Sequence, residues 1–455
     1  MKIPESPPIF ENDFGVGGEA TVRHFDMLVN PAIMPCDAKG RYLPWESLKH
    51  MDPPVGYTPA LYWFATRLAR DKISKELPFV DKYGEPFKYC LPDTALEKLL
   101  WISGQATGAV AGDPKITDPK TKRTYLINSL IEEAINSSQL EGAATTRAVA
   151  KEMIRTEREP KDKGEQMILN NYAAMRFISE FIDDPLTPSM VFELHKILTQ
   201  ETLDEGCEYK AGVFRDAQDN IAVEWDDGTT LHVPPHAGEL KERLDRVCAF
   251  ANAVDEPGNQ FIPPIVRAII VHFMVGYDHP FFDGNGRTAR ALFYWVMAKS
   301  GYWLMEYVSI SRVIKIKPIS YMKAYLHTET DSNDATYFIL HQLDIVEQAI
   351  TDLHVYLLKK TEELRDTEAA LKSSRLHGLL NHRQLALVRN AMQNPGAQYT
   401  VKSHQTSHGV ALQTARTDLL SLSEEHGVLR KLKEGKTDVF VAPNDLLGVI
   451  KRFKP

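Results

Sequence analysis

The stretch Tyr277–Arg290, YDHPFFDGNGRTAR, organises the sequence on both sides of it. It follows an apolar run at residues 261–276, FIPPIVRAIIVHFMVG. It leads into RTARALFYWVMAKSG, whose apolar residues recur at helical spacing and which ends on Gly301. We therefore expect a buried helix, a polar loop, and a second helix that begins near Gly286.

The loop has the composition of an anion site. Gly284, Asn285 and Gly286 allow backbone conformations in which N–H groups converge on one point. The N-terminus of the following helix would direct more N–H groups, and the positive end of its dipole, at the same anion. Arg287 and Arg290 are three residues apart, so they share a helix face, and guanidinium groups suit phosphate oxygens. The pattern indicates a nucleotide phosphate site.

Two side chains of the stretch add reactive groups to this site. Asp283 is expected to hold a Mg²⁺ ion that bridges the phosphates. His279, whose ordinary pKa is near neutral, is expected to take a proton from an attacking hydroxyl. The competing interpretation is a loop in which Asp283 caps a helix and the arginines form surface ion pairs. The number of specific residue types in this order argues against it.

Composition bounds the class of protein. A chain of 455 residues with 43% hydrophobic and 25% charged residues is typical of a globular protein of several units. The net charge of -8 argues against a general nucleic-acid coat, although a local basic module remains compatible with it. The four cysteines are scattered, which predicts neither a zinc site nor a disulfide framework and favours a cytoplasmic protein. The longest apolar run contains Arg267 and His272, so no membrane partner is expected.

Pro and Gly residues interrupt the helical pattern, and we divide the chain into four parts. We expect an N-terminal helical domain at 1–115 with a loosely ordered start, a helical core at 120–356, a charged linker helix at 357–375, and a last domain at 376–455. The last domain reads as helix, helix–turn–helix and two strands around Glu434-Gly435, which is the order of a winged helix. It carries 11 Lys and Arg against 6 Asp and Glu, a net charge of +5.

One segment of the core departs from the helical pattern. AGVFRDAQDNIAVEWDDGTTLHVPP, residues 211–235, alternates polar and apolar residues and places Asp227-Gly228 at a turn. This predicts a β-hairpin inside a helical domain. A hairpin with an exposed edge can take up an extended peptide by backbone hydrogen bonding, and the alternative is a structural hairpin with no ligand.

The segment HPFFDGNGRTAR resembles the signature of Fic-domain proteins, HPFx(D/E)GNGRxxR, at every specified position. The resemblance extends over roughly residues 125–350. It implies a mainly α fold with a Fic-type helical core and a β-hairpin flap, beside the N-terminal helical domain and the C-terminal winged helix. It also implies an enzyme that moves AMP from ATP, with Mg²⁺, to a Ser, Thr or Tyr hydroxyl of a target protein. The implied site comprises His279 as general base, Asp283 as metal ligand, Gly284, Asn285 and Gly286 as the anion hole, Arg287 as a catalytic phosphate contact, and Arg290 at the γ-phosphate or a regulatory carboxylate.

A second motif, SSQLEG at residues 137–142, resembles the inhibitory motif (S/T)xxxE(G/N) of the same family through Ser137, Glu141 and Gly142. The resemblance implies an inhibitory helix at 125–142, in which Glu141 pairs with Arg290 and occupies the space of the ATP γ-phosphate. On residue chemistry alone, Glu141 is simply exposed at a helix end, where its charge opposes the helix dipole.

The resemblance leaves the partners and the direction of the reaction open. Target proteins are expected to dock on the flap around 219–233, and a homodimer is compatible with the sequence. The alternative activity is removal of AMP from a modified protein, with Glu141 positioning water. A further alternative is a DNA-binding regulator that uses the basic winged helix, although a protein-recognition module accounts for that domain better.

Overall fold

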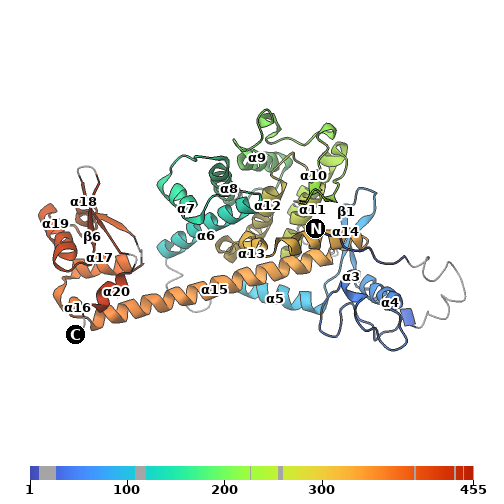
Figure 1. Ribbon diagram of the computed structural model, residues 1–455, viewed down its shortest axis with the longest axis horizontal. Helices are drawn as coiled ribbons and strands as arrows, with labels where there is room; N and C mark the ends of the chain where they lie inside the picture. The colour runs from blue at the N-terminus through green and yellow to red at the C-terminus, as the bar shows by residue number, and fades with distance from the viewer. Residues whose placement is uncertain are drawn as a thin grey trace, which may run out of the picture. The chain divides into compact units, whose positions relative to one another are not determined.

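The computed structural model describes residues 1–9, 27–107, 119–225, 227–254, 260–393, 396–434, 437–443 and 445–453. These residues form two compact units, Met1–Thr351 and Asp352–Pro455. The chain is mainly helical with a few short strands, so the predicted fold class is confirmed (Figure 1). Most of the segment expected to be loosely ordered lies outside the described residues.

The N-terminal part of the first unit combines helices with a β-hairpin. Its elements are α3 (Trp45–Leu48), α4 (Pro59–Asp71), β1 (Lys75–Val80), β2 (Pro86–Tyr89) and α5 (Asp93–Thr107). The sequence did not lead us to expect the hairpin, because Pro78 lies inside β1. Proline is tolerated there because β1 pairs with one neighbour, β2, and Leu77 and Phe79 alternate inward.

This N-terminal part packs against the helical core rather than forming a compact unit of its own. The backbone of Lys88 in β2 exchanges hydrogen bonds with Asn333 and Ala335. The buried guanidinium of Arg70 in α4 lies 3.6 Å from the ring centre of Tyr42 and donates to the hydroxyl of Tyr337. Residues 27–107 are therefore joined to the start of α15 (Thr336–Ser373) and the residues just before it.

The core of the first unit consists of helices around α11 and α12. Nearly every residue of α11 and α12 is buried, as expected for helices that are apolar on most faces. The helices are α6 (Pro119–Leu140), α7 (Arg147–Thr156), α8 (Lys163–Glu180), α9 (Pro188–Thr199), α10 (Leu240–Asn252), α11 (Pro264–Asp278), α12 (Asn285–Lys299), α13 (Ile310–Ile316), α14 (Pro318–Thr330) and the first part of α15 (Thr336–Ser373), which continues past Thr351 into the second unit. The segment expected as a separate linker helix is the last part of α15.

The second unit contains the predicted helix, helix–turn–helix and two strands, together with a third strand and two short helices that were not predicted. A three-stranded antiparallel sheet in the order β5-β7-β6 packs on helices through the buried side chains of Val388, Leu419, Phe440 and Ile450. The elements are α16 (Arg375–Leu379), α17 (His382–Gln393), β5 (Gln398–Thr400), α18 (Val401–His408), α19 (Leu412–Leu420), β6 (Arg430–Glu434), β7 (Thr437–Val441) and α20 (Leu446–Lys451). The predicted turn at Gly435 lies outside the described residues. No helix within the described ranges is long and apolar enough to cross a membrane.

Candidate active site

The loop between α11 and α12 holds the residues singled out by the sequence. Helix α11 ends at Asp278, and His279 follows with φ of 45° and ψ of 58°, the left-handed region. Helix α12 begins at Asn285 after Gly284, whose φ is 80°. A Cβ on Gly284 would lie 2.9 Å from Cγ2 of Thr199, so glycine suits this position for both its backbone and its neighbours.

The hydrogen bonds of His279 define which of its nitrogens is free. Nδ1 lies 3.3 Å from the carbonyl oxygen of Gly276. A carbonyl only accepts, so Nδ1 carries the proton and Nε2 keeps a lone pair. Burial lowers the pKa of His279 to about 4, and the nearby carboxylate of Glu141 only partly offsets this effect. The imidazole is therefore neutral at pH 7 and can accept a proton through Nε2.

Arg215 holds the turn that carries His279. Its Nε donates to the carbonyl of His279 at 2.7 Å, and its backbone N–H donates to the carbonyl of Pro280 at 2.9 Å. Its Nη2 donates to Pro235 at 2.5 Å and to Asp278 at 3.3 Å, both through carbonyl oxygens. A left-handed conformation is costly for a residue other than glycine, and these contacts stabilise it. We did not identify Arg215 from the sequence, because a single arginine before the flap carries no pattern.

His195 is a second positioning residue that the sequence did not reveal. The backbone N–H of Gly212 donates to its Nδ1 at 2.9 Å, so Nε2 carries the proton and donates to the carbonyl of Asp283 at 2.8 Å. The ring stacks on Phe281 with 3.8 Å between centroids. Asn285 closes the loop further, because its side chain exchanges hydrogen bonds with the backbone N–H and carbonyl of Phe281. The side chain of Asn285 thus shapes the loop.

The start of α12 offers unused hydrogen-bond donors. The first N–H groups of an α-helix have no acceptor within the helix, and no other acceptor is found for those of Asn285 and Gly286 among the described residues. Arg287 is buried, with Nη1 donating to the carbonyl of Leu198 at 2.8 Å and Nη2 lying 3.3 Å from Asp283 Oδ2. Its Nε has no hydrogen-bond partner in the described structure. This set of donors fits an anion such as a phosphate.

The end of α6 reaches the same place from a distant part of the chain. Arg290 donates from Nε to Ser137 Oγ at 2.9 Å and from Nη2 to the Ser137 carbonyl at 3.1 Å. Its Nη2 also lies 2.8 Å from Glu141 Oε1. The expected charge pair is therefore formed, and Ser137 and Glu141 share one guanidinium.

The carboxylate of Glu141 lies directly over the anion loop. A Cβ built on Gly286 would collide with Glu141 Oε1 and lie 3.0 Å from Arg290 Nη1. Burial on its own raises the pKa of Glu141, but the guanidinium groups of Arg290 and Arg287 outweigh it and lower the pKa below its ordinary value. Glu141 is therefore an anion beside the donors at the start of α12.

Gly142 has a structural role next to Glu141. The N–H of Gly142 donates to the carbonyl of Gln139, and the N–H of Ala143 donates to the carbonyl of Ser138. Together with the φ of 93° at Gly142, this is the Schellman pattern that ends a helix. Helix α6 ends at Leu140, so Glu141 projects from the point at which the backbone turns away.

Metal ligands are sparse at the site. No cluster of three or more His, Cys, Asp or Glu side chains that could hold a metal is found in the described ranges. Asp283 supplies one partly exposed carboxylate, loosely paired with Arg287. Mg²⁺ commonly binds one or two carboxylates together with substrate phosphates. The residues thus fit a magnesium ion that arrives with a nucleotide, with Asp283 as its protein ligand.

Two tyrosines of α14 line the site beside the arginine. The hydroxyl of Tyr321 accepts from or donates to Nε2 of His272 at 2.8 Å and lies 3.4 Å from that of Tyr325. A Cβ on Gly276 would collide with the Tyr325 hydroxyl, so glycine lets this ring approach α11 closely. We did not identify these residues from the sequence, because tyrosines at helical spacing are common in cores.

The predicted hairpin is present but short. Strands β3 (Val223–Glu224) and β4 (Thr230–His232) pair antiparallel, with Val223 opposite His232 and Glu224 opposite Thr230. Gly228 takes a φ of 79° at the turn. No third strand pairs with this sheet among the described residues.

Comparisons with known proteins find one family model and several relatives that match parts of the chain. Residues 185–297 match the model of the Fic/DOC family. The chain is 24% identical over 260 residues to a protein adenylyltransferase Fic of Culex quinquefasciatus, covering 56% of this chain and 47% of the relative. A protein of the same name from Nematostella vectensis is 24% identical over 173 residues, or 37% of each chain. The chain thus spans less than half the length of these relatives.

Solved structures give matches of low identity. A Fic family protein from Desulfovibrio desulfuricans G20 superposes with a TM-score of 0.49 at 17% identity, covering 76% of this chain and 94% of that one. Fic-1 (residues 134–508) from C. elegans gives a TM-score of 0.45 at 18% identity, covering 58% and 73%.

Proposed function

We propose that the protein transfers AMP from ATP to a hydroxyl side chain of a target protein. The observation that carries this proposal is a neutral His279 with a free Nε2, in the loop that leads to the N–H groups at the start of α12, for which no acceptor is found among the described residues. The names of the relatives, protein adenylyltransferase Fic, support the same class of reaction.

The chemistry assigns a role to each group. Nε2 of His279 takes the proton as the target hydroxyl oxygen bonds to the α-phosphorus. The bond from that phosphorus to the bridging oxygen breaks, and pyrophosphate leaves. The N–H groups of Asn285 and Gly286 and the guanidinium of Arg287 stabilise negative charge on the phosphates. Magnesium held by Asp283 would neutralise charge on the departing phosphates.

We propose that Glu141 restrains this reaction. An anionic carboxylate over Gly286 competes with phosphate oxygens for the same donors, and it occupies Arg290. ATP that binds beside Glu141 would then be held with its α-phosphorus out of line with the incoming hydroxyl. Such a misalignment can raise the activation free energy of transfer by roughly several kcal/mol. Targets are proposed to align along the flap between 219 and 233, where an open strand edge can pair with an extended segment.

A second candidate activity is removal of AMP from a modified target. The observation in its favour is the lowered pKa of Glu141, caused mainly by the arginines that offset its burial, in a side chain that also influences His279. A carboxylate in this position can orient a water molecule for attack on the same phosphorus.

The test is intact-mass analysis of the full chain after incubation with ATP and Mg²⁺. Glu141→Gly should gain AMP on itself or on added protein, on the order of tenfold or more faster than the parent chain. Glu141→Gln keeps the volume over Gly286 without the charge, so an intermediate rate is expected. Glu141→Gly combined with His279→Ala should gain nothing. Equal rates in the parent and Glu141→Gly would overturn the restraint, and loss of AMP removal in Glu141→Gly would favour the second candidate.

A further inference from the structure

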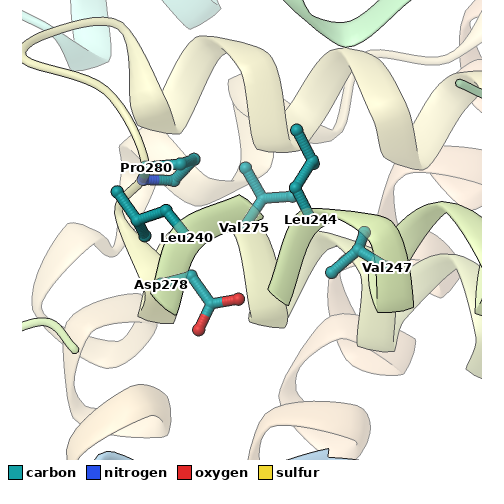
Figure 2. A pocket seen from close by; sticks show the side chains of 6 residues that line it. All are labelled: Leu240, Leu244, Val247, Val275, Asp278 and Pro280. Atoms are coloured by element: carbon teal, nitrogen blue, oxygen red, sulfur yellow. The ribbon is translucent and has the colours of Figure 1, made fainter. Parts of the chain in front are cut away.

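Asp278, the residue immediately before His279, is an unexpected choice at its position. It is the last residue of α11, where the negative end of the helix dipole disfavours a carboxylate. It is buried, and the small pocket that it lines is otherwise formed by apolar side chains from α10, α11 and Pro280 (Figure 2). The helix dipole and the apolar surroundings each disfavour a carboxylate here. Its presence beside a proposed base therefore calls for a functional explanation.

The partner of Asp278 is Arg243 of α10. Nη1 of Arg243 lies 3.1 Å from Asp278 Oδ1 and 2.8 Å from the carbonyl oxygen of Val80. Its Nη2 donates to the carbonyl of Asp81 at 2.8 Å, and its Nε to Glu239 at 2.9 Å. One buried guanidinium thus ties the last residue of α11 to the end of β1.

The hairpin held by Arg243 also reaches the flap. The backbone N–H of Lys82 donates to the hydroxyl of Tyr277 at 3.2 Å, and its Nζ donates to the carbonyl of Val233 at 3.0 Å. Val233 directly follows β4. The turn between β1 and β2 is therefore connected both to the end of α11, directly before His279, and to Val233 at the end of the flap.

We propose that Asp278 and Arg243 are positioning residues for His279, which fix the catalytic turn through a side chain while Arg215 fixes it through carbonyl oxygens. The ion pair keeps the last turn of α11 in place, so that His279 retains its left-handed backbone and directs Nε2 into the site. This inference rests on the proposed function of His279 as a base.

The charges that face Asp278 set its titration. They are Arg243 from α10, Arg215 from the segment before the flap, and His232 from β4. Burial is the largest influence and raises the pKa of Asp278 to about 6 despite these groups. A carboxyl whose pKa is raised on folding stabilises the fold most below its unfolded pKa, and this contribution is lost as the pH rises through 6. The ionised Asp278 therefore does not favour the fold at pH 8.

The first test compares variants in the Glu141→Gly background, with AMP transfer as the readout. Asp278→Asn should lower turnover roughly tenfold, because the amide holds Arg243 without a charge, while the KM for ATP and the melting temperature at pH 8 do not fall. Glu239→Gln is the matched control, since Glu239 pairs with the same guanidinium but lies away from the turn, and it should retain turnover. Full turnover in Asp278→Asn, or equal losses in both variants, would overturn the proposal.

The pH profile separates positioning from the base itself. Turnover of the Glu141→Gly parent should fall as the pH drops through about 6, where Asp278 protonates, although His279 with a pKa of about 4 is still neutral. In Asp278→Asn this decline should disappear, leaving a low and flat rate down to about pH 5. A decline that persists unchanged would assign it to another group and contradict the proposal.

An activity-independent readout distinguishes failure of this inference from failure of the proposed function. In NMR spectra of the full chain with ¹⁵N-labelled histidine, His279 is identified by its loss in His279→Ala. In the parent, the spectrum should show the Nδ1–H tautomer of His279 above pH 6 and a disturbed signal below pH 6. In Asp278→Asn, the signal of His279 should not change over this pH range. If Asp278→Asn fails to fold, Arg243→Lys is used instead. It keeps a positive charge beside Asp278, so the His279 signal must still change with pH. Absence of the response in the parent overturns the inference, whether or not the protein transfers AMP.

Discussion

His279, the proposed base, is held in one state by backbone contacts and burial. Its Nδ1 is committed to the Gly276 carbonyl, and its own carbonyl is held by Arg215. Burial removes the competing charged form at neutral pH. The imidazole is thus fixed in one tautomer and one protonation state, which is what a general base requires.

At this scale we predict that His279→Ala in the Glu141→Gly background lowers AMP transfer by roughly 10²–10⁴-fold. ATP affinity should be preserved, because the donors at the start of α12 do not involve this imidazole. Transfer can be followed by labelled nucleotide and affinity by calorimetry. His50→Ala, in an exposed histidine of the N-terminal part, serves as the control and should keep full activity. Comparable activity of the two variants would disprove the assignment of the base.

The end of α6 is the element on which the proposed restraint depends. The Schellman pattern at Gly142 ends the helix at Leu140, directly before Glu141, whose carboxylate pairs with Arg290. Buried Glu133, two turns earlier, accepts hydrogen bonds from Tyr294 and Ser309 at 2.9 and 2.7 Å and anchors the helix to α12 and α13. The position of Glu141 is therefore fixed by the anchored helix before it and by the Schellman turn after it.

Gly142→Ala is predicted to weaken restraint. A side chain at a φ of 93° is disfavoured by about 1 kcal/mol, so the helix end should shift and Glu141 with it. AMP transfer should rise above that of the parent but stay below that of Glu141→Gly. Gly409→Ala imposes a similar backbone cost at φ of 61° in the second unit and should leave transfer unchanged. A melting curve for each variant checks that the two costs are comparable.

The features that could be predicted from the sequence are those that leave a local pattern in it. The helices on either side of the loop, the hairpin at 211–235 and the Glu141–Arg290 pair follow from periodicity, turn residues and motif. The β1–β2 hairpin was missed, because Pro78 weakens the strand pattern. Arg215, His195 and Arg243 were missed for another reason: each acts through backbone carbonyls or a single neighbour far away in the chain, and no local spacing records such contacts.

On the scale of the whole molecule, the chain has two compact units with separate cores. The second unit buries Val388, Leu419 and Phe440 among its own helices and strands. Asp418 of α19 accepts from Arg383, Asn381 and His404, which ties three helices of this unit together. Each unit therefore has the interactions that support its own cooperative unfolding.

We predict two thermal unfolding transitions, of which one responds to nucleotide. ATP with Mg²⁺ should raise the transition of the first unit in Glu141→Gly, by about 2.7 kcal/mol of stabilisation at a ligand concentration of 100 times Kd. The transition of the second unit should not move. Differential scanning calorimetry of the full chain measures both, and a single transition that shifts as a whole would show that the units unfold together.

The most direct test of the central claim uses two labelled forms of ATP. Glu141→Gly is incubated with Mg²⁺ and ATP labelled either at the α-phosphate or at the γ-phosphate, and the protein is separated from free nucleotide. Attack on the α-phosphorus predicts that protein acquires the α-label and none of the γ-label, and that adding His279→Ala abolishes the signal. Incorporation of the γ-label would identify phosphate transfer instead, and absence of both labels would contradict nucleotide transfer by this site.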